Sequence, residues 1–350
     1  MGSVPLILLF LGFIASVVVT WIAGINLTKT TDSLDTRFKI GDALGGLILL
    51  GITGSLPEIA VVTSAAIHGH IPVIIGNLIG GLSIQTLLLV FFDFVNKGKR
   101  PLSYLAGSIT LFFETMFAVL IAFLVLIGTF VPAEKSILNF NPLTILIVIA
   151  WVSGLFLINK IREVARFNKV APDASPGRKQ QERRHFENYT FYAKKSTIHI
   201  LLIFFFAAAA TFAAGFLLEE TGTAIASVFG IGSGIFAATV LALVTSLPEI
   251  STGLESVIIG DNQLAISDIF GSNAFMLTIF FLADLLAGGP VLSSAGSQGT
   301  IFAILGVTMM SVYGVTFLIK LKNRYFRLGL DSILVVILYI VGIFALQRVM

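Results

Sequence analysis

Long apolar segments constrain the fold of this chain more than any other feature. Ten of them can each cross about 30 Å of hydrocarbon as a helix. Lipid leaves only helices and closed barrels as spanning structures, because every backbone polar group must be paired. Hydrophobic residues make up 56% of the chain and charged residues 12%. We therefore predict an all-α integral membrane protein with transmembrane helices at 4–26, 41–67, 71–93, 103–128, 142–160, 197–219, 233–259, 264–285, 299–320 and 329–348.

The chain also contains an internal duplication. The segment Gly54-Ser55-Leu56-Pro57-Glu58-Ile59 returns 191 positions later as Thr245-Ser246-Leu247-Pro248-Glu249-Ile250. A second matching pair of segments follows at the same offset and contains Asn77 and Asp268, each 19 residues after its glutamate. A regular internal offset is typical of repeat architectures. The sequence thus predicts two repeats that keep their polar residues in register.

The predicted organisation is a first five-helix repeat at 1–160, a hydrophilic linker at 161–196 and a second five-helix repeat at 197–350. Five is an odd number, so the second repeat enters the membrane inverted relative to the first. Inverted repeats with broken helices characterise secondary transporters, whose sites lie near the bilayer midplane. Pro57 and Pro248 fall near the middle of helices 2 and 7, where proline removes a backbone hydrogen bond. Both helices are therefore predicted to be broken.

Orientation follows from the basic residues. Of the 22 Lys and Arg residues, all but Lys135 and Arg348 lie on one side of the predicted membrane. The positive-inside rule makes this side cytoplasmic. The expected location is the cell membrane, with a cytoplasmic linker and both termini outside. Two further expectations concern the helix ends. Asp93 and Asp284 are interpreted as solvated, and His68 and His70 as interfacial bystanders in a short outer loop.

The interiors of the predicted spans contain no Lys or Arg, so no salt bridge to a basic residue of a span can form at Glu58, Glu249, Asp268 or Glu114. An ionised carboxylate in hydrocarbon is costly, so each must be protonated, hydrated or bound to a cation. Two facing carboxylates with neutral oxygens suit Ca²⁺, which prefers 6–8 oxygen ligands. Na⁺ could use the same hydroxyls and carbonyls. Two roles stay open for Glu114, as a protonated packing residue or as a proton-linked one. Asp268 is either a functional acid of the site or an acid simply solvated at the start of its span.

The duplicated motifs resemble those of the sodium/calcium exchangers in the cation/calcium exchanger superfamily. The family signature Gly-Thr-Ser-Leu-Pro-Glu is matched best by residues 244–249. The resemblance implies four ligand-bearing helices, here helices 2, 3, 7 and 8, and alternating access by sliding of helices 1 and 6. It implies Ca²⁺ bound by two glutamates, with Na⁺ sharing that region. The residues implied as cation ligands, or facing the site, are Glu58, Glu249, Ser55, Thr245, Ser246, Asn77, Asp268, Ser272, Gln85, Gly51 and Ala242.

The chain departs from the family pattern at several positions. Gly54 and Gly81 stand where Thr and Ser are expected, and Gln85 and Met276 where Asn and Asp are expected. Asp268 replaces the usual Asn. One of the implied sodium sites is thus complete, and the other has lost two side-chain oxygens.

The function predicted is a secondary active antiporter that exchanges Ca²⁺ for Na⁺, and an H⁺-coupled cation exchanger is the alternative. A cation channel is a weaker hypothesis, because channels usually gain their symmetry by oligomerising. An enzyme is not expected, since the chain has no cysteine and no nucleophile–His pair or phosphate-binding loop. We expect no prosthetic group and no nucleic acid. The expected partners are the lipid bilayer and small inorganic cations, with a monomer as the simplest state.

Overall fold

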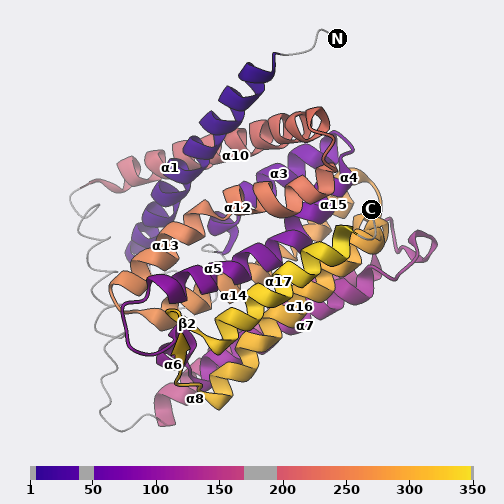
Figure 1. The fold of residues 1–350 in the computed structure, drawn as a ribbon. Helices are drawn as coiled ribbons and strands as arrows, with labels where there is room; N and C mark the ends of the chain where they lie inside the picture. The colour runs from indigo at the N-terminus through magenta and orange to yellow at the C-terminus, as the bar shows by residue number, and fades with distance from the viewer. Residues whose placement is uncertain (1–4, 39–50, 169–194, 348–350) are drawn as a thin grey trace.

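The computed structural model describes residues 5–38, 51–168 and 195–347, and nearly all of them are helical (Figure 1). The α-helices are α1 (Leu6–Phe38), α3 (Leu56–Ile67), α4 (Ile71–Ile75), α5 (Gly81–Val95), α6 (Leu102–Ala106), α7 (Ile109–Gly128), α8 (Pro142–Asn168), α10 (Thr197–Val228), α11 (Ser233–Phe236), α12 (Ala242–Thr245), α13 (Leu247–Ile258), α14 (Asn262–Met276), α15 (Ile279–Ala287), α16 (Gly296–Ile319) and α17 (Leu330–Gln347). Two π-helices, η2 (Gly76–Gly80) and η4 (Ala237–Leu241), two 3₁₀ turns, η3 (Ala133–Lys135) and η5 (Val291–Ser294), and an antiparallel pair, β1 (Arg324–Tyr325) with β2 (Leu328–Gly329), complete the fold.

The apolar helices confirm an integral membrane protein. Among the described residues, seven helical stretches are long and apolar enough to cross a bilayer, and the bent pair α11–α13 would make eight. Helices α3 and α17 are apolar but shorter. Residues 41–50 of the second predicted span lie outside the described residues. The count of ten spans therefore stays a prediction.

Two predicted span boundaries are wrong. The span at 103–128 is divided, because α6 ends at Ala106 and α7 begins at Ile109. Ser108 separates them as the N-cap of α7, and its Oγ accepts a hydrogen bond of 3.2 Å from the Leu111 N–H. Hydropathy alone does not detect such a cap. Helix α10 continues to Val228, well past the predicted end at 219, so Glu219 lies inside it.

The duplicated proline motif produces the same local geometry twice. Ser55 (φ −91°, ψ 19°) precedes α3, and Ser246 (φ −84°, ψ 7°) precedes α13. Each serine leaves the helical conformation just before the Leu-Pro step, because proline cannot donate to the carbonyl four residues earlier. The break at Ser246 bends helix 7 by 49°. The predicted break in helix 7 is thus observed, and Ser55 marks the matching break before α3.

Helices α1 and α10 lie together at one side of the bundle, and α7, α16 and α17 lie at the other (Figure 1). Two glycines allow close approach to the broken helices. A Cβ on Gly24 of α1 would lie 2.5 Å from Cγ of Pro248. A Cβ on Gly215 of α10 would collide with Cβ of Ala60 and lie 3.2 Å from the Pro57 carbonyl oxygen. Gly24 and Gly215 are themselves 191 positions apart, so each peripheral helix packs on the proline break of the other half.

Asp93 and Asp284, also 191 positions apart, are both buried, so their expected solvation is wrong. Asp284 accepts hydrogen bonds from the Asn141 and Val291 N–H groups and from the Thr144 hydroxyl, at 2.8–3.0 Å. Asn141 and Thr144 lie at the start of α8, and Val291 begins the η5 turn that follows α15. The carboxylate therefore connects the C-terminal end of α15 to the start of α8.

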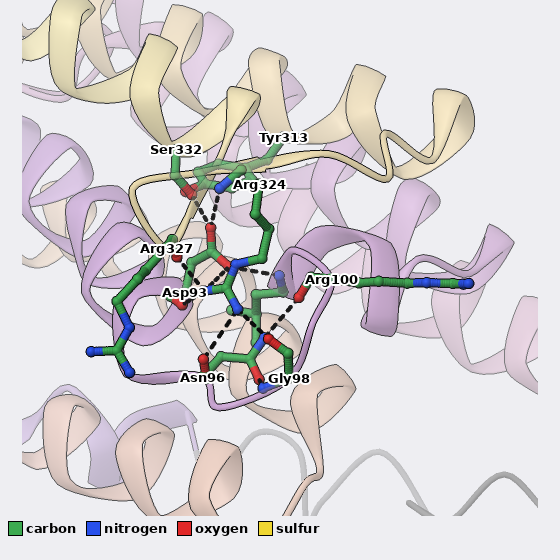
Figure 2. Close-up of polar contacts among 10 residues, drawn as sticks. Asp93, Asn96, Gly98, Arg100, Tyr313, Arg324, Arg327 and Ser332 are labelled. Carbon is green, nitrogen blue, oxygen red and sulfur yellow. Dashed lines mark hydrogen bonds and ion pairs between the residues drawn. The ribbon is translucent and has the colours of Figure 1, made fainter.

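Asp93 fastens the opposite end of the bundle together with the mostly buried side chain of Arg324 (Figure 2). It accepts hydrogen bonds from the N–H groups of Leu102 and Gly329 and from the Ser332 hydroxyl, at 2.6–2.9 Å. The Arg324 guanidinium lies 3.7 Å from Asp93 Oδ1 and donates to the main-chain carbonyl of Asp93 at 2.6 Å. The same guanidinium donates to the carbonyl oxygens of Asn96, Gly98 and Arg327. This network joins the end of α5 to the β1–β2 hairpin.

Replacing Asp93 by Asn tests the role of this network in stability. In this variant an amide NH₂ group faces the Leu102 and Gly329 N–H groups and the Ser332 hydroxyl, which are donors too. The variant also removes the negative charge that compensates Arg324. Losses of this kind cost about 2–4 kcal/mol. We expect a lower thermal unfolding temperature in detergent for Asp93→Asn and an unchanged one for Glu134→Gln, whose side chain is exposed. Equal unfolding temperatures for Asp93→Asn and the wild type would contradict this role.

Candidate cation site

The two breaks carry both motif glutamates into the protein interior. Glu58 lies in the first turn of α3 and Glu249 in the first turn of α13, and the residues are 1% and 4% exposed. The N–H groups of a first helical turn favour a negative side chain. Glu249 is close enough to Glu58 for their charges to interact. Two segments far apart in the sequence therefore bring their carboxylates to one place.

Neither carboxylate has a basic partner in the part of the chain that the structure describes. Among the described residues, no salt bridge reaches Glu58 or Glu249. Neither carboxylate oxygen of Glu58 makes a hydrogen bond in the described part of the chain, and the Thr245 side chain lies near this carboxylate. Glu249 Oε1 accepts a bond of 3.2 Å from the Ser272 hydroxyl, while its Oε2 is unpaired. Three of the four carboxylate oxygens are thus without a donor among these residues.

Asp268 lies beside this pair at the surface. Its side chain is exposed, and its Oδ2 accepts a hydrogen bond of 3.0 Å from the Thr252 hydroxyl. Thr252 follows Glu249 by one helical turn and also donates to the Glu249 carbonyl at 3.2 Å. The charges of Asp268 and Glu249 interact. An exposed acid and a buried acid are therefore connected along the α13–α14 contact.

Small hydroxyl residues surround the two breaks. Ser55, Thr245 and Ser246 are each 1% exposed. The Ala242 carbonyl accepts from the Ser246 N–H at 3.2 Å, the Ser246 hydroxyl at 2.8 Å and the Thr245 hydroxyl at 3.3 Å. The Gly51 carbonyl, at the matching position, accepts from the Ser55 N–H at 3.1 Å. Both predicted backbone ligands are therefore next to the breaks, and both already accept hydrogen bonds.

Buried amides add unpaired polar atoms. Asn77 and Gln85 are fully buried, and neither amide oxygen nor amide nitrogen of either residue has a hydrogen-bond partner within the described residues. Asn273 also has an unpaired oxygen there, and its amide nitrogen donates only a weak bond to the Met310 sulfur at 3.6 Å. An unsatisfied buried polar group costs about 1–3 kcal/mol. The sequence pattern does not single out Asn273, because its counterpart 191 positions earlier is the apolar residue Leu82.

The Met276 side chain fills the space next to Gly81, where the family pattern has a serine side chain. A Cβ built on Gly81 would lie 3.1 Å from both Sδ and Cε of Met276. The thioether therefore fills the space in which a serine at position 81 would put its hydroxyl. Gly54 differs, because no described atom lies within 4 Å of its Cβ position. A side chain added at Gly81 would therefore contact Met276, whereas one added at Gly54 would contact no described atom.

Glu114, the last of the four acids singled out in the sequence, accepts a hydrogen bond from a hydroxyl. The Ser267 hydroxyl donates to Glu114 Oε2 at 2.6 Å, and Ser267 directly precedes Asp268 in α14. Glu114 on α7 is 8% exposed. A hydroxyl partner is compatible with both roles left open for this residue.

The arrangement suits an oxygen-coordinated cation. Its donor set consists of carboxylates, hydroxyls, amides and carbonyls, which are the ligands that Ca²⁺ and Na⁺ take in proteins. Sulfur and imidazole ligands, which favour transition metals, do not occur among the predicted site residues. The uncompensated charge of Glu58 and Glu249 matches a divalent ion. The unpaired carboxylate oxygens of Glu58 and Glu249 are the observation that shows these residues fit a bound cation.

Comparison with known proteins shows the family. The family model described as "Sodium/calcium exchanger protein" matches residues 8–168 and 199–347. The chain therefore belongs to the sodium/calcium exchanger protein family, which is a family of membrane cation exchangers and not of enzymes. A protein of Alkalimonas amylolytica named "Putative antiporter CaxA" is 25% identical over 284 residues, covering 80% of this chain and 82% of that protein.

Solved structures share the fold. The crystal structure of the H⁺/Ca²⁺ exchanger CAX is similar with a TM-score of 0.63 at 13% identity, covering 97% of this chain and 88% of that one. A structure of the sodium-calcium exchanger NCX_Mj is similar with a TM-score of 0.56 at 18% identity, covering 97% and 98%. The fold is thus common to exchangers named for different counter-ions, and does not select between Na⁺ and H⁺.

Thermal unfolding in detergent tests the two glutamates as cation ligands. In a calcium-free choline buffer, Glu58→Gln and Glu249→Gln should unfold at no lower temperature than the wild type, because an amide costs less to bury than an unpaired carboxylate. Ca²⁺ at about 100 times its dissociation constant stabilises a protein that binds it by about 2.7 kcal/mol. This gain should appear in the wild type and be absent from both variants.

The matched control is Asp284→Asn. Asp284 is a buried acid whose oxygens are all paired, so the variant should unfold at a lower temperature and still be stabilised by Ca²⁺. A calcium-dependent increase of equal size in Glu58→Gln and the wild type would show that Glu58 is not a ligand.

Proposed function

We propose that the protein is a secondary active antiporter that exchanges Ca²⁺ for Na⁺ across a membrane by alternating access. The observation that carries this proposal is the pair of buried glutamates, Glu58 and Glu249, with no basic partner among the described residues. Two carboxylates neutralise Ca²⁺, and the surrounding hydroxyls and amides supply further oxygens. When the ion leaves, another cation has to compensate the buried charge, and this requirement couples the two fluxes.

The proposed architecture is ten transmembrane helices in two inverted five-helix repeats, at 1–160 and 197–350, joined by a cytoplasmic linker at 161–196. Matching local structures support the repeat. Gly69 and Gly260, 191 positions apart, both take left-handed conformations with φ of 72° and 87° at helix ends. The positive-inside rule places the basic loops in the cytoplasm and both termini outside. The cell membrane is the proposed location.

Alternating access is proposed to come from movement of α1 and α10 over the broken helices. Gly24 and Gly215 let these two helices contact Pro248 and Pro57 without side chains between them. A smooth contact of this kind lets one helix slide over another at low cost. Trp21 of α1 donates a hydrogen bond of 2.6 Å from its indole nitrogen to Ser251 of α13, and this bond must break when α1 moves.

The residues proposed as ligands have separate roles. Glu58 and Glu249 bind Ca²⁺ directly, and Asn77 and Gln85 turn amide oxygens toward the ion. Ser55, Thr245, Ser246 and Ser272 supply hydroxyls to Na⁺, with the carbonyls of Gly51 and Ala242. Asp268 forms an outer cation station, because it is exposed and its charge reaches Glu249.

A second candidate is H⁺-coupled exchange, and one observation favours it. The Met276 thioether fills the space beside Gly81, where a hydroxyl ligand for Na⁺ would otherwise lie. A carboxylate can release its cation by taking up a proton, so H⁺ can replace Na⁺ without that ligand. The similar fold of the H⁺/Ca²⁺ exchanger CAX is compatible with this candidate.

Uptake of radioactive Ca²⁺ into proteoliposomes tests the function. Liposomes loaded with Na⁺ should accumulate Ca²⁺ when they are diluted into sodium-free buffer, and Glu249→Gln should abolish the uptake. An imposed proton gradient replaces the Na⁺ gradient in a parallel experiment and tests the second candidate. Equal Ca²⁺ flux with no counter-ion on the opposite side would instead indicate a channel.

Restoring the missing oxygens tests the choice of counter-ion. At Gly54→Thr no described atom lies within 4 Å of the new Cβ, whereas Gly81→Ser needs the Met276 side chain removed. The third substitution is therefore Met276→Asp. The triple variant should show stronger and more cooperative Na⁺ dependence than the wild type in the same uptake assay. If it responds only to pH, the H⁺-coupled mechanism is correct. Met276→Ala alone is the matched control, because it clears the space without adding an oxygen.

The role of Asp268 is tested by Asp268→Asn. Loss of the outer negative charge should weaken the apparent cation affinity on the cytoplasmic side several-fold, since local charge raises cation concentration. Added to Asp268→Asn, Met276→Asp restores an acid on the same helix face, two turns away, and should partly recover the affinity. Unchanged affinity from both sides in Asp268→Asn would show that Asp268 is only a solvated residue.

A further inference from the structure

A second cluster of metal-ligating side chains lies apart from the proposed cation site, at the turn between α3 and α4. The turn is a Schellman motif, in which the His70 N–H donates to the Ala65 carbonyl at 2.8 Å and the Gly69 N–H to Ala66 at 3.3 Å. Gly69 has a left-handed φ of 72°. This reversal places the rings of His68 and His70 next to each other, with centroids 5.8 Å apart.

The third member of the cluster is Glu219 of α10, whose side chain is fully buried. Its Oε1 lies 2.6 Å from His70 Nδ1, and its Oε2 lies 3.5 Å from His68 Nδ1. The hydroxyls of Ser64 and Thr223 donate to the same carboxylate at 2.9 and 3.1 Å. A buried carboxylate is thus held in place by hydroxyl groups and aimed at two imidazoles.

We propose that His68, His70 and Glu219 form a binding site for a divalent transition metal ion, with Zn²⁺ as the ion that fits best. One ligand atom from each residue lies within 4.8 Å of the other two. Tetrahedral Zn²⁺ with bonds near 2.0–2.1 Å holds its ligand atoms about 3.3 Å apart. The separations of 2.6 Å from His70 Nδ1 to Oε1 and of 3.5 Å from His68 Nδ1 to Oε2 lie on either side of that value, so each imidazole has one carboxylate oxygen at about the required distance. Small side-chain rotations complete the site.

The chemistry of this cluster differs from that of the glutamate pair. Two imidazoles and one carboxylate form a donor set that suits Zn²⁺, whereas Ca²⁺ takes oxygen ligands. Three protein ligands leave a fourth tetrahedral position for water. The imidazole side chains are 38% and 40% exposed, so an ion can enter from outside the bundle.

Neighbouring groups orient the ligands. Histidines that bind a metal usually present their second ring nitrogen to a carboxylate. Here His68 Nε2 lies within ion-pair distance, at 3.8 Å, of Oε1 of Glu220, an exposed residue next to Glu219. Glu220 is thus the carboxylate placed to orient His68, and the Ser64 and Thr223 hydroxyls hold Glu219.

The second half of the chain does not repeat the site. The positions 191 residues from His68, His70 and Glu219 are Ile259, Asp261 and Thr28. The matching turn at Gly260 has the same backbone but lacks imidazole ligands. One ion per chain would therefore connect α10 of the second half to the α3–α4 turn of the first half.

Isothermal titration of the purified protein with Zn²⁺, after removal of any polyhistidine tag, tests the proposal. We expect one Zn²⁺ per chain. His68→Gln and His70→Gln should each weaken binding more than about 100-fold, and Thr223→Val, which removes a supporting group, about 10-fold. His199→Gln is the matched control, because His199 contacts Ser196 at the start of α10 and should have no effect. Ca²⁺ should not compete at this site, and Glu58→Gln should bind Zn²⁺ normally, whatever its transport activity.

X-ray absorption at the zinc edge identifies the ligand directly. The chain contains no cysteine, so His70→Cys introduces the one sulfur atom able to act as a thiolate ligand. Its first shell should gain a Zn–S distance of about 2.3 Å, while the wild type shows only N and O at about 2.0–2.1 Å. The proposal is overturned if the wild type binds no Zn²⁺, if His70→Gln binds as tightly as the wild type, or if His70→Cys binds Zn²⁺ without sulfur.

Discussion

Two carboxylates that are buried without a basic partner among the described residues, Glu58 and Glu249, are the constraint on which the rest of the structure depends. Moving an ionised group out of water costs far more than any single packing contact returns, unless charge or hydrogen bonds compensate it. Within the described residues, Glu58 has no donor and Glu249 has one. The proline breaks, the buried hydroxyls and the unpaired amides become understandable together if a cation supplies the missing partner.

The other pair of duplicated acids shows that burial alone does not make a site. Asp93 and Asp284 are as buried as Glu58, at 1% exposure each. Their oxygens, however, accept hydrogen bonds from main-chain N–H groups and hydroxyls, and Asp93 also faces Arg324 (Figure 2). Paired acids fasten helix ends, and unpaired acids remain available to an ion. The same duplication thus gives one pair a structural role and the other a proposed functional one.

Much of the arrangement could be predicted because the membrane permits few solutions. Hydropathy indicated the apolar helices, and the offset of 191 positions indicated that Glu58 and Glu249 meet. The split at Ser108 was missed because one capping hydroxyl does not change mean hydropathy. The burial of Asp93 was missed because its partner Gly329 lies 236 positions away. Glu219 was missed because it falls at the predicted end of its span, while α10 continues beyond it.

Anomalous X-ray diffraction from crystals soaked in Ca²⁺ locates the ion and tests the central claim most directly. We predict one strong peak between Glu58 and Glu249, at about 2.3–2.6 Å from their carboxylate oxygens, with further oxygens completing a shell of six to eight. The peak should disappear in crystals of Glu249→Gln. A wild-type map with no peak there, at a Ca²⁺ concentration that saturates transport, would contradict the account.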